Sequence, residues 1–356
     1  MTVRVGFLGA GLIATFHSKM LRHSGADAVW SGVYDPDRER SAAFAAASGA
    51  PVAGSEEEVL DGCDAVYVCT WTSEHRGLVE AAVARGLAVF CEKPLATDLA
   101  GATAMAHAVA EAGVVNQVGL VLRRSPAFNF LRSLIADPAS GRVMSVVFRD
   151  DQYIPTQGMY RSTWRGDVAR AGAGTLLEHS IHDLDMLEFV VGPVSSVSAR
   201  SAEFHGITGI EDAMAVSLGF TGGGVGYLVS VWRDVLERPS LRRVEVFCER
   251  AWFVLEGDWF GPLRWTRTAG GTDGDGGPGE EGEVEGAALV DELARRGTAA
   301  TNPDGDFVAA VAAGGGATPS FAEALRAHVL VDATYRSCRA GGDAVAVEQP
   351  PVAAGP

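Results

Sequence analysis

Lys93 has the residue type and the sequence position of a group that exchanges protons. It follows the apolar segment 88–90 within the run Cys91-Glu92-Lys93-Pro94. A partly buried lysine can act as an acid or a base near neutral pH, because burial disfavours its charged form. Pro94 restricts the backbone of Lys93 to an extended conformation and so directs its side chain. An exposed lysine in an ion pair fits the same residues, so both interpretations remain open.

A second group of titratable side chains lies in the segment 178–185, which reads Glu178-His179-Ser180-Ile181-His182-Asp183-Leu184-Asp185. At 100° per residue, Glu178, His182 and Asp185 share one face of a helix, while His179 and Asp183 occupy an adjacent face. Such a cluster indicates proton transfer or metal binding. A solvated helix face with incidental ion pairs is the alternative interpretation.

The third group is the run Gly9-Ala10-Gly11-Leu12-Ile13-Ala14, directly after the apolar segment 3–8. It matches G-x-G-x-x-A, in which Gly9 permits a tight turn and Gly11 lets the backbone approach a pyrophosphate. Ala14 keeps the following helix close to the strand, and the helix N-terminus attracts the negative charge. The run therefore predicts a dinucleotide site.

An acidic residue at the end of the second apolar run supports this interpretation. Asp35 stands where a carboxylate can bind both ribose hydroxyls and repel a 2′-phosphate. We therefore expect NAD as the cofactor. Arg38 and Arg40 follow closely and leave NADP possible.

The apolar pattern changes along the chain. Over the first 122 residues, short apolar runs alternate with helical patterns, which is typical of a doubly wound parallel sheet. From residue 123 to 341, strand patterns dominate and predict an α+β domain with an open, mostly antiparallel sheet. The sequence thus predicts an α/β Rossmann domain at 1–122 and a second domain at 123–341, whose C-terminal helix is free to return to the first.

Two segments lack a core pattern. Residues 269–286 are rich in Gly, Asp and Glu and predict a mobile surface loop, and residues 342–356 predict a C-terminal tail. The net charge of −16 disfavours nucleic acid and anionic membranes as partners. No apolar stretch reaches the ~20 residues of a membrane span, no secretion signal is evident, and five scattered cysteines suit a reducing compartment. We expect a cytoplasmic protein without a zinc site.

Together these motifs resemble the glucose–fructose oxidoreductase / inositol dehydrogenase (Gfo/Idh/MocA) family over nearly the whole chain, to about residue 340. The resemblance rests on the glycine run, Thr70-Trp71-Thr72-Ser73-Glu74-His75, Glu92-Lys93-Pro94, Val118-Gly119 with Arg123-Arg124, Trp164-Arg165, and the segment 172–185. It implies an active site in a cleft between the two domains, with a nicotinamide cofactor and a hydroxyl or carbonyl group of a sugar or cyclitol as the reacting centre.

Carried onto this sequence, the family's catalytic pair is Lys93 and His182. The family often has an aspartate where this chain has Glu178, and often Thr-Pro-Asn where this chain has Thr70-Trp71-Thr72. The resemblance implies that the cofactor site draws on Gly9, Gly11, Leu12, Ile13, Asp35, Arg38, Thr70, Trp71, His75, Glu92 and Lys93. It implies substrate contacts from Glu178, His179, Arg165, Trp164 and Arg123.

Two other classes of protein fit parts of the pattern. A dinucleotide-binding regulator would share the fold but lack turnover. A lyase or glycosidase of the same fold would retain NAD, or would use a metal held by the 178–183 side chains. We expect a small polyol or sugar substrate and a homo-oligomer, dimer or tetramer, because the outer face of a single-layer sheet needs cover.

Overall fold

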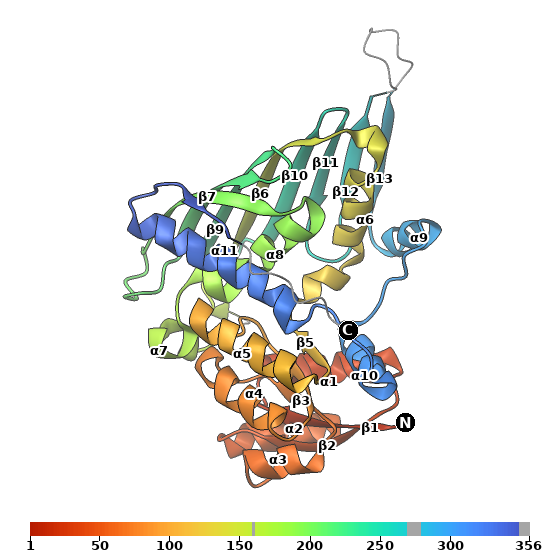
Figure 1. The fold of residues 1–356 in the computed structure, drawn as a ribbon, viewed down its shortest axis with the longest axis vertical. Coiled ribbons are helices and arrows are strands. Elements are labelled where there is room, and N and C mark those ends of the chain that lie inside the picture. The colour runs from red at the N-terminus through yellow and green to blue at the C-terminus, as the bar shows by residue number, and fades with distance from the viewer. Residues whose placement is uncertain (159–160, 269–278, 349–356) are drawn as a thin grey trace.

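A computed structural model describes residues 1–158, 161–268 and 279–348 of the chain. It contains two sheets, one in each of two domains, and the second sheet extends away from the first (Figure 1). The first sheet has five strands in the order β2-β1-β3-β4-β5, and the second has nine in the order β13-β12-β11-β10-β6-β9-β8-β7-β14. The predicted Rossmann domain and the predicted open sheet are confirmed.

The N-terminal sheet is parallel throughout. Its strands are β1 (Val3–Leu8), β2 (Ala28–Tyr34), β3 (Ala65–Val68), β4 (Ala88–Cys91) and β5 (Asn116–Val118). Its helices are α1 (Leu12–Ser24), α2 (Arg38–Ser48), α3 (Glu56–Gly62), α4 (His75–Val83) and α5 (Leu99–Ala112). Strands β3 and β4 are buried along their whole length, because helices cover both faces of the sheet.

The helix starts follow from local chemistry. Asp37, Ser55 and Asp98 each accept a hydrogen bond from a backbone N–H of the first turn of α2, α3 and α5. Gly25, Gly49 and Gly113 end their helices in the left-handed conformation. Helix α1 differs, since no side chain caps its N-terminus at Gly11.

The second sheet is antiparallel except where β6 pairs with β9 in parallel. Its strands are β6 (Val143–Tyr153), β7 (Val194–Ala202), β8 (Ala213–Phe220), β9 (Val225–Arg233), β10 (Leu241–Cys248), β11 (Ala251–Glu256), β12 (Leu263–Arg267), β13 (Glu280–Val284) and β14 (Val345–Ala346). Strand β9 alternates buried and exposed residues from end to end. This alternation is the mark of a sheet covered on one face.

Helices cover the inner face of this sheet. They are α6 (Pro126–Ile135), α8 (Ile181–Val190) and α11 (Phe321–Arg339), and α9 (Ala287–Arg295) packs beside α6 (Figure 1). Leu177, Ile181 and Leu184 are buried in this core. The remaining helices are α7 (Val168–Ala171) and α10 (Pro303–Ala313).

The C-terminal part of the chain contacts both domains. Helix α10 packs against α1 of the Rossmann domain, and α11 packs against α5, α8 and β7. Figure 1 shows α11 running between the two domains. Two late helices therefore return to the Rossmann domain, where the sequence pattern left only the last one free to do so.

The predicted loop 269–286 contains a strand. Residues 269–278 lie outside the described residues, but Glu280–Val284 forms the edge strand β13 on β12. Two acidic side chains of β13 contact β12. Glu283 pairs with Arg264, and Glu280 accepts a hydrogen bond from Trp265 Nε1. In the predicted tail 342–356, β14 pairs with β7, and residues 349–356 lie outside the described residues. Within the described residues, no helix is long and apolar enough to cross a bilayer.

Candidate active site

The turn between β1 and α1 is shaped to admit a nucleotide. Gly9 has a φ of 88°, and a Cβ there would lie 2.5 Å from the carbonyl oxygen of Cys69. A Cβ on Gly11, in contrast, would meet nothing within 4 Å. Because α1 also lacks a side-chain cap, its first N–H groups face open space beside Gly11. A pyrophosphate fits this cradle. Leu12 and Ile13 are exposed at the same helix start.

Asp35 lies beside this cradle at the end of β2. Its Oδ2 accepts a hydrogen bond of 2.9 Å from the backbone N–H of Ala10, and its Oδ1 accepts one of 2.9 Å from Asp37. The carboxylate is therefore fixed next to the glycine turn, where the ribose of a bound dinucleotide would lie. Arg38 is exposed at the start of α2.

The Thr70–His75 loop is held from behind by its histidine. His75 is buried, with Nδ1 2.9 Å from the carbonyl oxygen of Pro94 and Nε2 3.4 Å from that of Thr70. Burial lowers the pKa of His75, so the ring is neutral. His75 therefore lies beneath the predicted cofactor loop and supports it. The Arg170 guanidinium lies over the Trp71 ring, with its Cζ 3.9 Å from the centroid of that ring. Trp71 therefore contacts α7 of the second domain.

Lys93 reaches across the junction between the domains. It follows β4, is partly exposed, and donates a hydrogen bond of 2.6 Å from Nζ to the backbone carbonyl of Glu178. Burial lowers the pKa of Lys93, although the negative charges of Glu178 and Glu92 oppose the shift. A lysine with a lowered pKa is suited to exchange a proton.

His182 is the second titratable group at this junction. It is partly exposed in the first turn of α8, and its Nδ1 is buried without a hydrogen-bond partner among the described residues. Burial, reinforced by the positive charges of Lys93 and Arg242, lowers the pKa of His182 well below its usual range. The imidazole is therefore neutral, and a neutral ring offers a lone pair to an incoming proton.

Glu178 is a contact between the domains. Its side chain is 1% exposed, its Oε1 accepts 2.9 Å from Thr72 Oγ1, and its Oε2 accepts 3.3 Å from Arg165 Nε. The Arg165 guanidinium also stacks on Trp164, 4.5 Å from the ring centroid, and both residues are partly exposed. Glu178 thus contacts the first domain directly through Thr72, and Arg165 joins the junction through Glu178.

The prediction that Glu178, His182 and Asp185 share one face of a regular helix is wrong. Residues Leu176–Ser180 form a π-helical turn, which we call the π-turn, before α8. A π-turn holds more residues per turn than an α-helix and is frequent at functional sites. The side chains of the 178–185 segment consequently diverge. Glu178 faces Thr72, Asp185 pairs with Arg123, and Asp183 pairs with Arg242. Within the described residues they do not converge on a metal position.

Asp183 belongs to a buried ionic cluster behind the junction, and His179 borders this cluster with its ring partly exposed. Arg242 contacts Asp183 at 2.7 Å, Asp150 at 2.8 Å and Asp258 at 2.6 Å. The same guanidinium lies 3.0 Å from Nε2 of His179. No sequence motif predicts this cluster, because Arg242 and Asp150 are single polar residues on two separate strands. The sheet register places them directly opposite each other.

A second buried cluster supports the Glu92-Lys93-Pro94 motif. His17 on α1 has both ring nitrogens bonded to carboxylates, Nε2 to Glu92 and Nδ1 to Asp304, each at 2.8 Å. Glu92 also accepts from the backbone N–H of Lys93 at 3.1 Å. The cluster joins α1, the end of β4 and α10, and it makes Glu92 a support of Lys93.

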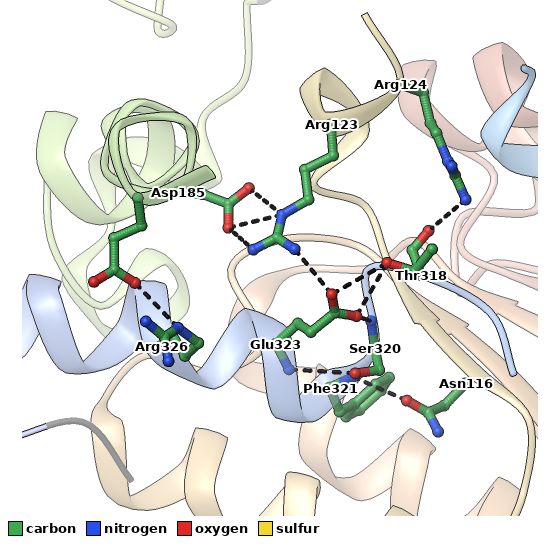
Figure 2. A network of polar contacts seen from close by, with 10 residues as sticks. Asn116, Arg123, Arg124, Asp185, Thr318, Ser320, Phe321, Glu323 and Arg326 are labelled. Atoms are coloured by element: carbon green, nitrogen blue, oxygen red, sulfur yellow. Dashed lines mark hydrogen bonds and ion pairs between the residues drawn. The ribbon is translucent and has the colours of Figure 1, made fainter. Parts of the chain in front are cut away.

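Arg123 lies in a polar network that connects helix α8 with helix α11 (Figure 2). It donates to Asp185 on α8, at 2.7 to 3.1 Å, and to Glu323 on α11 at 3.0 Å. Glu323 in turn accepts from Thr318 Oγ1 and the backbone N–H of Ser320. Because these partners occupy its guanidinium, the structure places Arg123 among the supports of α8.

Comparison with known proteins supports the fold and identifies the family. Residues 3–120 match the model of an oxidoreductase family with an NAD-binding Rossmann fold, and residues 128–254 match that of the GFO/IDH/MocA C-terminal domain. A levoglucosan dehydrogenase solved with NADH and levoglucosan shares the fold, with a TM-score of 0.83 at 22% identity over 98% of this chain and 100% of that one.

Among curated proteins, the 1,5-anhydro-D-fructose reductase of Ensifer adhaerens is 33% identical over 226 residues, which are 62% of this chain and 66% of that protein. An inositol 2-dehydrogenase of Cereibacter sphaeroides is 31% identical over 225 residues, 61% of this chain and 64% of that protein. The matches thus span slightly less than two thirds of these relatives. With family models matching both of its domains, the chain belongs to the Gfo/Idh/MocA family of oxidoreductases.

Proposed function

We propose that this protein is an NAD-dependent oxidoreductase that transfers a hydride to or from a hydroxyl or carbonyl carbon of a sugar, sugar derivative or cyclitol. The observation that carries the proposal is the meeting of Lys93 and the 178–182 segment across the domain junction, where Lys93 Nζ lies 2.6 Å from the Glu178 carbonyl. The names of the relatives, a sugar reductase and an inositol dehydrogenase, support the substrate class.

When bound, NAD supplies the hydride acceptor. The protein holds the substrate carbinol with Arg165, Trp164 and His179, which are partly exposed at the junction. Lys93 and His182 act as one proton-accepting unit for the reacting hydroxyl, because closely coupled groups titrate together. Burial lowers the pKa of both side chains, so each is neutral, and able to accept a proton, more of the time than its exposed counterpart would be.

The test is nicotinamide-linked turnover with a panel of sugars, cyclitols and their oxo forms. Reduction of NAD by a hydroxyl compound, or oxidation of NADH by the oxo form, supports the proposal. Binding of NADH without turnover of any panel member favours a regulator or an NAD-retaining lyase of the same fold.

The position of Asp35 predicts a preference for NADH over NADPH. Replacing Asp35 by Asn is expected to weaken NADH binding by about tenfold or more, the effect of losing a hydrogen bond to a charged group. The same change relieves repulsion of a 2′-phosphate and should raise NADPH affinity. Fluorescence titration of both nucleotides measures the ratio, and Asp27→Asn, at the opposite end of β2, is the control. An unchanged ratio in Asp35→Asn contradicts the assignment.

We further propose that the outer face of the nine-stranded sheet pairs with a second copy of the chain. Exposed apolar side chains gather there on β6, β9 and β10, namely Val147, Val225, Tyr227, Val229 and Phe247. Contiguous apolar patches of this kind mark interaction surfaces. Tyr227→Arg is expected to shift the sedimenting mass to the monomer, whereas Val29→Arg, on exposed β2, should leave it unchanged. Equal masses for both variants contradict the proposal.

We place the protein in the cytoplasm. Its five cysteines are free thiols, and four of them are buried. Reduced, buried cysteines suit a compartment that keeps thiols reduced.

A further inference from the structure

The segment that follows β4 is held by side chains rather than by a helix or a sheet. We call Lys93, Pro94 and Leu95 the lysine segment, and it lies in neither a helix nor a strand. The carbonyl oxygen of Pro94 lies 2.9 Å from Nδ1 of His75, and the N–H of Leu95 donates to Nε2 of His328 at 3.0 Å. Both rings are buried, with 1% and 2% of their surface exposed. The direction in which Lys93 leaves the strand therefore depends in part on these two contacts.

The two contacts require different hydrogen positions on the two rings. A carbonyl oxygen only accepts, so His75 must carry a hydrogen on Nδ1. A backbone N–H only donates, so His328 must offer a lone pair at Nε2, which only a neutral ring has. Burial lowers the pKa of His328 to about 4, in agreement with a neutral ring at pH 7. The lysine segment is thus held by one buried donor and one buried acceptor.

Helix α11, which carries His328, also holds the helix of His182. Arg326 on α11 pairs with Glu188 on α8 at 3.2 Å. The Arg123 network joins the same two helices (Figure 2). His328 stands two residues after Arg326, so one helix contacts both α8 and the lysine segment.

The same helix reaches the start of the π-turn. Tyr335 on α11 donates from its hydroxyl to Glu211 Oε1 at 2.9 Å. The same oxygen accepts from the backbone N–H of Leu176 at 2.9 Å, and Leu176 is the first residue of the π-turn. The π-turn contains the Glu178 carbonyl that accepts from Lys93 Nζ. The lysine segment and the acceptor of its side chain are therefore both tied to α11.

We propose that His328 is a positioning residue, which fixes the lysine segment to α11 and thereby sets how Lys93 meets the π-turn. The ring acts through the backbone of Leu95, two residues from Lys93. The inference rests on the proposed function for the catalytic role of Lys93, whereas the placement of its side chain can be measured without a substrate. No sequence motif predicts this role, because His328 is 233 positions from Leu95.

Replacements of His328 separate its acceptor from its volume. His328→Gln places an amide oxygen near the position of Nε2 and keeps an acceptor for the N–H of Leu95. His328→Leu fills a similar volume and leaves that buried N–H without a partner. His328→Asn takes the place of His328→Leu if the latter does not fold, because its amide is one methylene too short to reach Leu95. Thr334→Val is the control on the same helix, since it removes a buried hydroxyl that donates to the Leu330 carbonyl.

The reactivity of Lys93 tests its placement without a substrate. In a Lys19→Arg background, Lys93 is the only lysine, and its modification by an amine reagent is followed by peptide mass over a range of pH. Its midpoint should lie below that of an ordinary lysine, because burial lowers the pKa of Lys93. His328→Leu should raise the midpoint by roughly one pH unit, since a loosened segment exposes the amine to water. His328→Gln and Thr334→Val should keep the original midpoint. An unchanged midpoint in His328→Leu overturns the proposal, whether or not a substrate has been found.

Steady-state kinetics with the panel member of highest turnover test the consequence for catalysis. His328→Leu should lower kcat by about 10- to 100-fold, as a misplacement on the order of 1 Å does, while KM and NADH affinity persist. His328→Gln should recover most of this loss, and Thr334→Val should show none of it. Equal losses of kcat in His328→Gln and His328→Leu would show that the acceptor does not matter and would overturn the proposal.

Discussion

Replacing Lys93 by Ala is expected to lower turnover by roughly 10²–10⁴-fold, the usual contribution of a positioned acid or base. His182→Ala should have an effect of the same order, because the two residues form one proton-accepting unit. NADH affinity should persist in both variants, since the glycine cradle and Asp35 lie elsewhere. Nicotinamide absorbance measures turnover, and fluorescence titration measures binding.

The low lysine content of the sequence allows the pKa of Lys93 to be tested directly. It contains only one other lysine, Lys19, which is exposed on α1. In a Lys19→Arg background, Lys93 is the single lysine side chain available to an amine reagent. Its rate of modification should reach half-maximum below the pH of an ordinary lysine, as burial requires. Near-normal turnover in both Lys93→Ala and His182→Ala would contradict the assignment of these two residues as the acid and base.

Replacing His17 by Ala is expected to destabilise the fold by about 3–5 kcal/mol, the cost of breaking a buried ion pair by removing one partner. The change leaves Glu92 and Asp304 buried and facing each other across a cavity. Thermal unfolding measures the loss. The matched control is His23→Ala on the same helix, which removes an exposed histidine and should change stability by no more than about 0.5 kcal/mol. Equal melting temperatures for the two variants contradict the account.

The His17 cluster also predicts how stability changes with pH. Burial lowers the pKa of the ring, but the charges and hydrogen bonds of Asp304 and Glu92 outweigh burial and raise the pKa from 6.5 to about 10. A group whose pKa is raised by folding stabilises fully below its unfolded pKa and loses this contribution as pH rises through its folded pKa. The contribution should therefore be complete below pH 6.5 and gone above pH 10. His17→Ala should show a flatter dependence over this window.

Local motifs predicted the part of the site that local chemistry determines. The β1 strand, the Gly9 turn and α1 are continuous in sequence, so strand, turn and helix appear where the glycine spacing indicated. Lys93 follows its strand for the same reason. Asp35 also lies at the end of its strand, since a parallel sheet brings neighbouring strand ends to one edge.

The remaining parts depend on contacts between distant segments. Asp304 is far from His17 in sequence and reaches it only because α10 packs on α1. Arg242 meets Asp150 through the register of β10 and β6, which no single-strand pattern contains. The π-turn before α8 places the Glu178 carbonyl within reach of Lys93 Nζ, a contact made only when the domains meet. Helical periodicity assumes a regular turn and therefore missed it.

The central claim is that this protein binds NAD and uses it to oxidise or reduce a sugar-like substrate. The most direct measurement is a fluorescence titration of the purified protein with NADH, followed in the same cuvette by the oxo sugars and oxo cyclitols of the panel. The account predicts saturable NADH binding and a substrate-dependent loss of NADH absorbance that Lys93→Ala removes. Absence of binding by both NADH and NADPH would contradict it.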